Sequence, residues 1–164
     1  MQVIHLPTGY TIILDCFAWA FLQTSIAYFC VRMPVSRLDP NGWLFRTRRW
    51  EKGGDLYMRL FRVRKWKSRL PSGGIVFKNG FSMKQVASRQ EDYLERWLRE
   101  TCRAELMHWI ALAVSGLFFL WNPPLLGSLM VIYAVIANLP CLVTQRYNRP
   151  RILRILHESD TSKT

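Results

Sequence analysis

The sequence predicts an all-α integral membrane protein, because apolar and basic residues are kept apart along the chain. Hydrophobic residues make up 50% of the 164 residues, yet the formal net charge is +12. Residues 107–144 contain no Lys, Arg, Asp or Glu, and residues 10–31 contain a single acid, Asp15. This length is typical of one domain, so we expect a single membrane domain over residues 1–164.

Three stretches are apolar enough to form membrane helices. Residues 10–31 and 125–144 each supply the roughly 20 residues that cross a hydrocarbon core, and residues 104–121 are slightly fewer. The first stretch lacks the cleavage pattern of a signal peptide, so we expect a retained helix. The sequence Asn122-Pro-Pro124 ends the second helix. Residues 107–144 either span the membrane twice or form a re-entrant hairpin, and both arrangements fit the flanking charges.

Polar residues interrupt two of these stretches. Asp15 and Gln23 in the first either bond to neighbouring helices or line a substrate channel. Asn138 and Pro140 lie in the third, where the proline removes one backbone hydrogen bond and is expected to kink the helix.

The remaining residues are strongly basic. Residues 32–103 and 145–164 carry nearly all of the Lys and Arg, whereas residues 1–10 and the turn at residues 122–124 carry none. The positive-inside rule therefore predicts a multi-pass protein of the cell membrane. Its N-terminus lies outside, and residues 32–103 and a basic tail over residues 145–164 lie in the cytoplasm.

Aromatic residues alternate with Lys and Arg at helical spacing over residues 56–67. This pattern predicts a basic amphipathic helix in the membrane interface; a solvated basic face that packs a few aromatic residues is the alternative. Residues 75–81 are expected to be extended. A long amphipathic helix is expected to begin near Ser82 and to enter the membrane near His108.

The basic excess requires a partner of opposite charge: nucleic acid, anionic lipid headgroups or a phosphorylated substrate. The apolar helices argue against nucleic acid and favour membrane lipid. The four cysteines form no C-x-x-C pair, and three of them lie in apolar stretches. We therefore predict neither a disulfide framework nor a zinc site.

Glu105 and His108 are three residues apart where the chain enters the membrane, and they share one face of a helix. Ionisable groups at this depth are costly and indicate function. His108 is a general base that Glu105 orients, or the pair is half of a di-iron motif, or it is a structural pair in a helix bundle. The chain has no second E-x-x-H sequence, which disfavours a metal.

The run Gln145-Arg-Tyr-Asn-Arg-Pro-Arg151 follows the last membrane helix. Its arginines either interact with the helix C-terminus and with lipid or bind the phosphate groups of a substrate. The run Val63-Arg-Lys-Trp-Lys67 has the same two readings. The sequence lacks G-x-S-x-G, P-loop and dinucleotide-binding motifs, which argues against a soluble hydrolase, a P-loop kinase and a dinucleotide enzyme.

These two runs resemble motifs of the glycosyl-4,4'-diaponeurosporenoate acyltransferase family, as do Arg103-Ala-Glu-Leu-Met-His-Trp-Ile110 and Tyr133-Ala-Val-Ile-Ala-Asn-Leu-Pro140. The family's N-terminal and middle patterns are similar to Trp19, Gln23, Arg32-Met-Pro34, Glu51-Lys52 and Gly54. The resemblance runs from about Trp19 to Arg151 and is poor across residues 75–90.

The resemblance implies a small bacterial membrane O-acyltransferase. Such an enzyme esterifies a sugar hydroxyl of a glycosylated terpenoid, a carotenoid or another glycolipid, with a fatty acyl group, as in the last step of staphyloxanthin-type carotenoid synthesis. The positions that match the family's motifs are Arg64, Lys65, Trp66, Arg103, Glu105, His108, Asn138, Gln145, Arg146, Asn148 and Arg149.

We assign roles to these positions as hypotheses. His108 takes a proton from the acceptor hydroxyl and Glu105 orients it, while Asn138 or Gln145 donates a hydrogen bond to the tetrahedral oxyanion. The substrate-binding residues are Arg64, Lys65, Trp66, Arg103, Arg146, Asn148 and Arg149. Among them, Arg64, Arg146 and Arg149 hold the phosphates of the acyl donor, which is acyl-CoA or acyl-carrier protein.

We expect no cofactor beyond this co-substrate and no metal. Direct attack by the hydroxyl needs no covalent intermediate, although Cys102 is a nearby thiol that could form one. The partners implied are membrane lipid, a glycolipid acceptor and the acyl donor. A non-catalytic lipid-binding or scaffold subunit and a metal-dependent membrane enzyme are alternatives. The sequence leaves open the acceptor, the acyl chain length and whether the chain forms a homo-oligomer.

Overall fold

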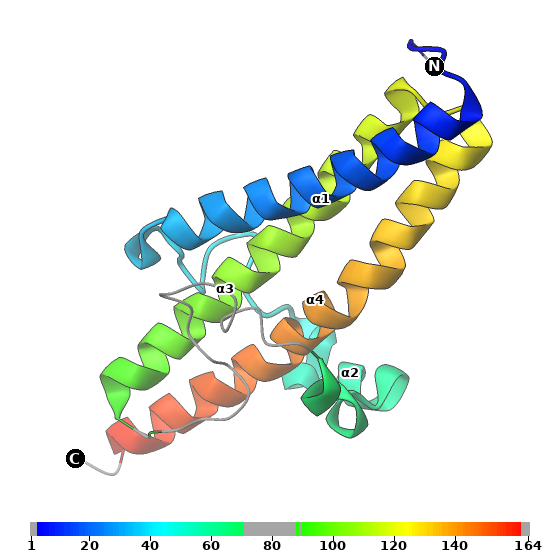
Figure 1. The fold of residues 1–164 in the computed structure, drawn as a ribbon. Coiled ribbons are helices and arrows are strands. Elements are labelled where there is room, and N and C mark those ends of the chain that lie inside the picture. The colour runs from blue at the N-terminus through cyan, green and yellow to red at the C-terminus, as the bar shows by residue number, and fades with distance from the viewer. Residues whose placement is uncertain (1–2, 71–87, 89, 162–164) are drawn as a thin grey trace.

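The computed structural model describes residues 3–70, 88 and 90–161, and the regular elements among these residues are all helices. The long ones are α1 (Thr8–Arg32), α3 (Glu91–Val114) and α4 (Pro124–Thr161), shown in Figure 1. The short helix α2 (Asp55–Phe61) lies between α1 and α3 in the sequence. Short 3-10 helices complete the fold: η1 (Val35–Arg37), η2 (Arg49–Gly54), η3 (Val63–Lys65), η4 (Lys67–Arg69) and η6 (Ser115–Leu120). The predicted all-α fold is confirmed.

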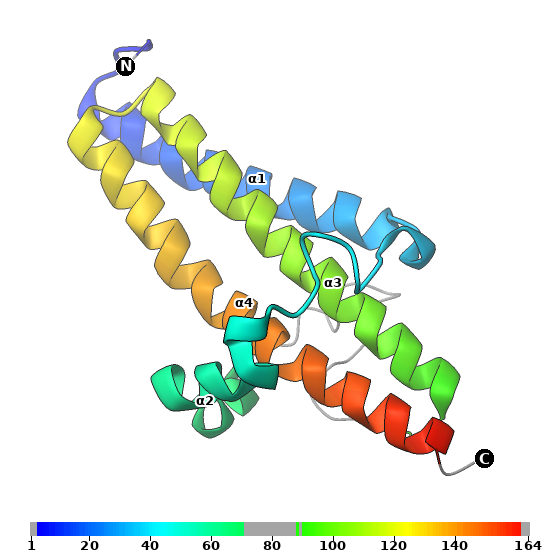
Figure 2. The same ribbon diagram turned by 180° about the vertical axis from the view of Figure 1, so that it is seen from behind.

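The central helix of the bundle is α3. It packs against α1 and against α4, and α4 returns antiparallel to it (Figures 1 and 2). The start of α1 lies beside the α3–α4 turn, where the N–H groups of Val3 and Ile4 donate to the Leu120 carbonyl at 2.7 and 3.0 Å. The C-terminus lies at the opposite end of the bundle (Figure 1). We call this opposite end, where α3 begins and α4 ends, the basic end.

Three helical stretches within the described residues are long and apolar enough to cross a membrane: Thr8–Arg32, Glu91–Leu120 and Pro124–Glu158. Their outward faces carry large exposed apolar side chains. Phe17 on α1 is 71% exposed and Ile136 on α4 is 67% exposed. Contiguous apolar surface of this kind is rare on soluble monomers and suits a lipid environment. These features indicate a membrane protein, as the sequence predicts.

The first membrane helix follows its predicted bounds closely. It ends at Arg32, because Pro34 disfavours a helical conformation for Met33. The buried carboxylate of Asp15 accepts hydrogen bonds from Trp121 Nε1 at 2.7 Å and Asn122 Nδ2 at 2.8 Å. Asp15 therefore ties α1 to the α3–α4 turn, which agrees with the reading that polar residues of this helix bond to neighbouring helices.

The last helix is longer than the sequence predicts. We expected a span that stops at Thr144 and a separate tail, but α4 continues to Thr161 through both Pro140 and Pro150. Each proline removes one backbone hydrogen bond. Packing offsets that loss, because Tyr147 and Ile152 beyond the apolar stretch are 0% and 3% exposed. The residues beyond Thr144 are therefore part of the bundle.

The basic segment also differs from its prediction. In place of one amphipathic helix over residues 56–67, α2 stops at Phe61, and Arg62 adopts a left-handed conformation with φ 48°. The indole N–H of Trp66 donates to the Phe61 carbonyl at 2.6 Å, so it satisfies a backbone acceptor at the helix end. The chain then continues as η3 and η4.

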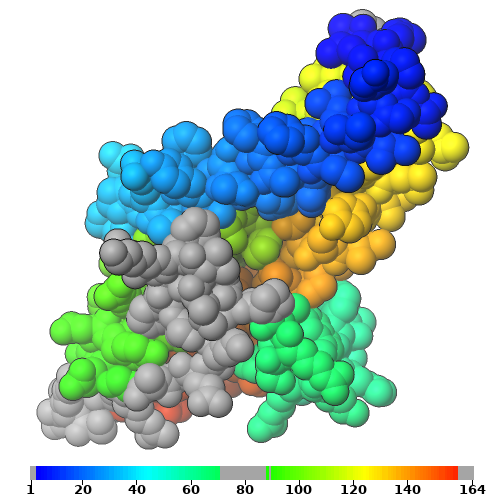
Figure 3. Space-filling model, viewed as in Figure 1, coloured from blue at the N-terminus to red at the C-terminus, as the bar shows by residue number. Residues whose placement is uncertain are grey.

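We call residues 49–69 the basic lobe. It packs on α4 and forms the teal and green bulge beside α4 in Figure 3. The expected extended piece over residues 75–81 and the helix start at Ser82 lie outside the described residues. The helix that carries Glu105 and His108 begins at Glu91.

Candidate active site

The carboxylate of Glu105 is fully buried between α3 and α4. Its Oε1 accepts hydrogen bonds from Arg146 Nε at 2.7 Å and from Trp109 Nε1 at 3.1 Å. Its Oε2 accepts one from Arg149 Nη2 at 2.6 Å. Both oxygens are therefore bound by cations from α4, and the carboxylate is held in one orientation.

Arg146 extends this ion pair to the basic lobe. Its Nη1 lies 3.2 Å from Glu51 Oε1 and donates to the Arg46 carbonyl at 3.2 Å, and its Nη2 donates to the Leu44 carbonyl. The Tyr57 hydroxyl donates to the same Glu51 oxygen at 2.9 Å. The guanidinium of Arg146 thus joins α3, the loop before η2, and η2.

Arg149 is held in a similar way, and its side chain is 1% exposed. Its Nε donates to Thr101 Oγ1 at 3.1 Å, and its Nη1 donates to the Phe45 carbonyl at 2.6 Å. We call Glu51, Glu105, Arg146 and Arg149 the charge network. Two carboxylates and two guanidinium groups balance each other in it, which offsets the cost of burying four charges.

His108 lies one helical turn after Glu105 and faces α4. Its Nδ1 is 2.7 Å from Asn138 Oδ1. The Asn138 amide nitrogen donates to the Ala134 carbonyl at 2.8 Å, which fixes the amide so that its oxygen faces the imidazole. Because that oxygen can only accept, Nδ1 must carry the proton. The neutral imidazole then keeps the lone pair of Nε2 for another proton.

The predicted pairing of His108 with Glu105 is not the one that the structure shows. Both oxygens of Glu105 bind guanidinium or indole N–H groups, and the imidazole bonds to Asn138. The reason is charge, because two cations on α4 bind a buried carboxylate more strongly than a neutral imidazole does. By the same geometry, Arg146 and Arg149, which we expected to hold donor phosphates, are already occupied by carboxylates and carbonyls.

Gln145 belongs to the same face of α4. It lies seven residues after Asn138 and four residues before Arg149, so the three side chains share one face of the helix. Gln145 is 8% exposed, and its Oε1 has no hydrogen-bond partner among the described residues. A buried amide oxygen without a partner is unusual in a folded protein. Gln145 therefore stays a candidate for contact with a substrate on this face of α4.

Arg103 has a different position from the other predicted site residues. Its guanidinium donates to the carbonyls of Cys30, Val31 and Met33 at the end of α1, the last two at 2.9 and 2.8 Å, and pairs with Glu100 at 2.9 Å. A cation at the C-terminal end of a helix is favourable. Arg103 thus holds the C-terminal end of α1 against α3.

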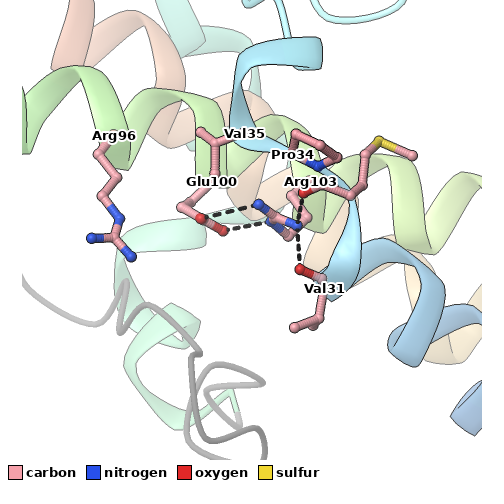
Figure 4. Close-up of a pocket in the computed structure, with 7 residues that line it drawn as sticks. Val31, Pro34, Val35, Arg96, Glu100 and Arg103 are labelled. Atoms are coloured by element: carbon pink, nitrogen blue, oxygen red, sulfur yellow. Dashed lines mark hydrogen bonds and ion pairs between the residues drawn. The ribbon is translucent and has the colours of Figure 1, made fainter.

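Figure 4 shows the pocket of about 220 Å³ beside this contact, lined by Val31, Met33, Pro34, Val35, Arg96, Glu100 and Arg103. His108 and Arg103 are five residues apart on α3 (108 − 103), which at about 100° per residue places them about 140° apart around the helix. The pocket and the imidazole therefore lie on different faces of α3.

The remaining predicted binding residues lie in or against the basic lobe. Arg64 and Lys65 are exposed, and Trp66 is half-buried. Asn148 on α4 accepts a hydrogen bond from Lys67 Nζ at 2.9 Å. These residues form a second group at the basic end, next to the charge network along α4.

Two side chains of the lobe have shifted pKa values. Burial raises the pKa of the Tyr57 hydroxyl, and the Glu51 carboxylate beside it raises it further. Burial lowers the pKa of Lys67, and the nearby cations Arg151 and Arg64 lower it further. Tyr57 thus stays protonated and donates to Glu51. The positive charge of Lys67 is opposed by burial and by the neighbouring cations.

Sequence reasoning missed several residues that the structure brings to this site. Glu51 appeared only as part of a family pattern and Lys67 only as part of the run Val63-Arg-Lys-Trp-Lys67, and Thr101 and Tyr57 were not assigned to the site. Glu51 and Lys67 lie on the 3-10 helices η2 and η4, which have no periodic pattern. Thr101 and Tyr57 lie on α3 and α2, but their partners depend on how these helices pack, which spacing alone does not show. Within the described chain, no three His, Cys, Asp or Glu side chains are grouped as metal ligands.

Comparison with known proteins gives a consistent result. The family model for glycosyl-4,4'-diaponeurosporenoate acyltransferase matches residues 40–158. Proteins with this name from Staphylococcus aureus strains bovine RF122 / ET3-1 and USA300 are each 33% identical over 138 residues, covering 84% of this chain and 83% of theirs. No solved structure matches. The chain therefore belongs to the glycosyl-4,4'-diaponeurosporenoate acyltransferase family, and it is an enzyme that transfers an acyl group.

Proposed function

We propose that this chain is a membrane O-acyltransferase that esterifies a sugar hydroxyl of a glycosylated carotenoid, or of a related glycolipid, with a fatty acyl group. The names of the S. aureus relatives support the acceptor class. The observation that carries the mechanism is the contact of 2.7 Å between His108 Nδ1 and Asn138 Oδ1. It holds a neutral imidazole in one tautomer at the point where α3 and α4 pack together.

His108 is the general base in this mechanism, and Asn138 is the residue that positions it. The O–H bond of the acceptor sugar breaks, and its proton passes to His108 Nε2. The oxygen forms a bond to the acyl carbonyl carbon of a thioester donor. Asn138 Oδ1 accepts the Nδ1–H throughout, so it keeps Nε2 directed at the hydroxyl and stabilises the imidazolium.

The tetrahedral adduct then collapses. Its carbon–sulfur bond breaks, and the departing thiolate takes the proton from His108, which leaves an ester and a free thiol. The oxyanion needs a hydrogen-bond donor while it exists. The amide N–H of Gln145 supplies it in this proposal, because the Asn138 amide N–H already donates to the Ala134 carbonyl.

We propose direct attack by the hydroxyl without a covalent acyl-enzyme. Cys102, the thiol nearest to Glu105 in sequence, is 0% exposed and packs with Leu38 and Phe45. Its Sγ lies 3.6 Å from the Leu98 carbonyl. A thiol enclosed in this way has no path to a thioester, so Cys102 is a core residue in this mechanism.

The site faces the cytoplasm in this proposal, because the positive-inside rule places the basic end there. The acyl donor, acyl-CoA or acyl-carrier protein, approaches from that side. The acceptor's apolar part and the acyl chain remain in the lipid beside α1 and α4, whose outer faces are apolar. No metal or further cofactor takes part.

Acyl transfer by purified protein tests the proposal. Wild type and His108→Ala are incubated in detergent micelles with radiolabelled fatty acyl-CoA and a glycosylated carotenoid, and the labelled ester is measured. We expect ester from wild type, and a kcat for His108→Ala that is lower by about 10²–10⁴-fold, the usual contribution of a general base.

His5→Ala is the matched control, because His5 is an exposed histidine near the N-terminus. It should retain the wild-type rate. Unchanged transfer by His108→Ala contradicts the mechanism. Absence of transfer by wild type with several glycolipid acceptors contradicts the proposed reaction and favours a scaffold subunit.

A further inference from the structure

Two cationic side chains converge on the buried ring of Tyr147 at the basic end. The Arg151 guanidinium carbon lies 3.9 Å from the centroid of this ring, and Arg151 also donates to the Tyr147 hydroxyl. Lys67 Nζ lies 5.1 Å from the same centroid and 2.9 Å from Asn148 Oδ1. Each contact fixes the cation against a π-system or a neutral oxygen.

Arg64 on η3 is the third member of this group. It is exposed and lies three residues before Lys67 (67 − 64) on η3, which packs against η4. Burial lowers the pKa of the Lys67 ammonium group, and the charges of Arg151 and Arg64 lower it further. Neither Arg64, Lys67 nor Arg151 forms an ion pair with a carboxylate among the side chains that the structure describes.

Three other cations of the bundle have a carboxylate partner among the described residues. Arg103 pairs with Glu100, and both Arg146 and Arg149 pair with Glu105. Holding like charges together without a counterion costs free energy. An anion that binds between Arg64, Lys67 and Arg151 would remove this repulsion, and its oxygens would accept the N–H groups that the protein leaves available.

We propose that Arg64, Lys67 and Arg151 form a phosphate-binding site on the basic end, with Asn148 and the Tyr147 ring positioning Lys67. The phosphate belongs to the acyl donor or to a lipid headgroup, and the experiment below separates these sources. The site keeps Arg64 of the donor clamp that the sequence predicted. It replaces Arg146 and Arg149, whose guanidinium groups are bound by Glu105.

Its distance from His108 favours the acyl donor, and this step rests on the proposed function. Asn148 and Arg151 follow Asn138 by 10 and 13 residues along α4 (148 − 138 and 151 − 138). At about 1.5 Å per residue, these separations correspond to about 15–20 Å along the helix. A donor with its phosphate at Lys67 therefore needs an extended arm to reach the imidazole. The phosphopantetheine group of CoA and of acyl-carrier protein is such an arm between phosphate and sulfur.

Binding of CoA to the full chain in neutral detergent tests the proposal without turnover. CoA carries the phosphates, and pantetheine, which lacks them, is the matched ligand. Wild type should bind CoA and not pantetheine, and inorganic pyrophosphate should compete. Lys67→Gln and Arg151→Gln should each weaken CoA binding by at least about tenfold, since each removes a charge-assisted contact.

Arg59→Gln removes an exposed cation of α2 outside this group and should leave CoA binding unchanged. Lys67→Arg keeps the positive charge and should bind CoA. If Lys67→Arg also failed to bind CoA, the loss of binding in Lys67→Gln would be due to misfolding rather than to the lost charge. In a parallel arm, native mass spectrometry measures bound phosphatidylglycerol. If CoA does not bind, but Lys67→Gln and Arg151→Gln lose phosphatidylglycerol, the phosphate is that of a lipid headgroup.

The phosphate site would be overturned if Lys67→Gln and Arg151→Gln bound CoA and phosphatidylglycerol at wild-type levels. It would also be overturned if wild type bound neither ligand. The His108→Ala variant separates this inference from the proposed function. It should bind CoA normally and fail to transfer the acyl group. Normal transfer by His108→Ala with loss of CoA binding in Lys67→Gln contradicts the mechanism and leaves the phosphate site intact.

Discussion

At the scale of single residues, Glu105 and His108 have different partners although they are one turn apart on the same helix. Glu105 is bound by Arg146 and Arg149, whereas His108 is bound by Asn138. Spacing predicted that both side chains share one face of a helix, and in the structure both contact α4. It could not predict their partners, because these depend on the register of α4 against α3, which no local pattern encodes. We therefore propose that the charge network is structural and that the neutral pair of His108 and Asn138 acts in catalysis.

Asn138 should act on the rate of acyl transfer rather than on donor binding. Asn138→Leu keeps the size of the side chain and removes the acceptor for Nδ1–H, so the imidazole can rotate or change tautomer. We expect kcat to fall on the order of 10- to 100-fold with little change in KM for the acyl donor. Asn138→Asp retains an acceptor oxygen and should retain most of the activity. Steady-state kinetics of the two variants check this, and equal losses in both would contradict a positioning role.

Glu105 should determine stability more than chemistry. Glu105→Gln leaves Arg146 and Arg149 buried with less negative charge, and breaking a buried pair in this way costs about 3–5 kcal/mol. For a chain of this size, Tm should fall by about 10 °C. Thermal unfolding in micelles, followed by circular dichroism, measures the change.

The control for this prediction is Glu95→Gln on the exposed face of α3, which should leave Tm unchanged. A Glu105→Gln variant with wild-type Tm and strongly reduced kcat would show that the carboxylate acts in the reaction after all.

At the scale of elements, the apolar helices followed from the sequence and the basic segment did not. A long uncharged run identifies a membrane helix by itself, and α1 ends within a residue or two of its predicted bounds. In the basic lobe, a left-handed residue, Arg62, interrupts the helical spacing, and long-range contacts such as Lys67 with Asn148 hold the shape. Long-range packing also explains why α4 continues past Pro150. Burial of residues such as Tyr147 outweighs the helix-breaking tendency of proline.

The attachment of the basic lobe should depend on pH through Tyr57. The pKa of its hydroxyl is raised above the usual value of 10.0, first by burial and then by Glu51. A group with a raised folded-state pKa stabilises the fold fully below its unfolded pKa, and this contribution is lost as pH rises through the folded pKa.

The Tyr57→Phe variant removes this hydroxyl. It should be less stable than wild type at pH 7 by about 1.5–3 kcal/mol, the value of a hydrogen bond to a charged group. The difference should shrink as the pH is raised above about 10, where the hydroxyl starts to ionise in the unfolded chain. Denaturant unfolding at several pH values measures it. Tyr10→Phe, at an exposed tyrosine of α1, is the control and should show no difference at any pH.

At the scale of the whole molecule, three helices that are long and apolar enough to cross a membrane are combined with one basic end. Separation of charge along the sequence predicted the membrane class, and the apolar outer faces of the three helices agree with it. The distribution of Lys and Arg gives the sidedness, and we propose that the basic end lies in the cytoplasm. The fold also brings the candidate base on α3 and the proposed phosphate site of the basic lobe against one helix, α4, through the contacts of His108 with Asn138 and of Lys67 with Asn148. No single motif reveals this arrangement.

Cysteine labelling in intact cells tests this orientation. His5→Cys adds an exposed thiol next to Ile4, which bonds to the α3–α4 turn, and Ser68→Cys adds one on η4 in the basic lobe. A membrane-impermeant maleimide should label His5→Cys in intact cells, and it should label Ser68→Cys only after permeabilisation. The unsubstituted chain controls for its native cysteines. The reverse labelling pattern would contradict the proposed topology and would place the donor site outside the cell.

The central claim is that the imidazole of His108, held by Asn138, takes the proton of the acceptor hydroxyl. The most direct measurement is a double-mutant cycle of kcat with wild type, His108→Ala, Asn138→Leu and the double variant. If the two residues act as one unit, the double variant should be no slower than His108→Ala alone, because Asn138 has no role without the imidazole. Independent losses that multiply in the double variant, or wild-type activity in His108→Ala, would contradict the mechanism.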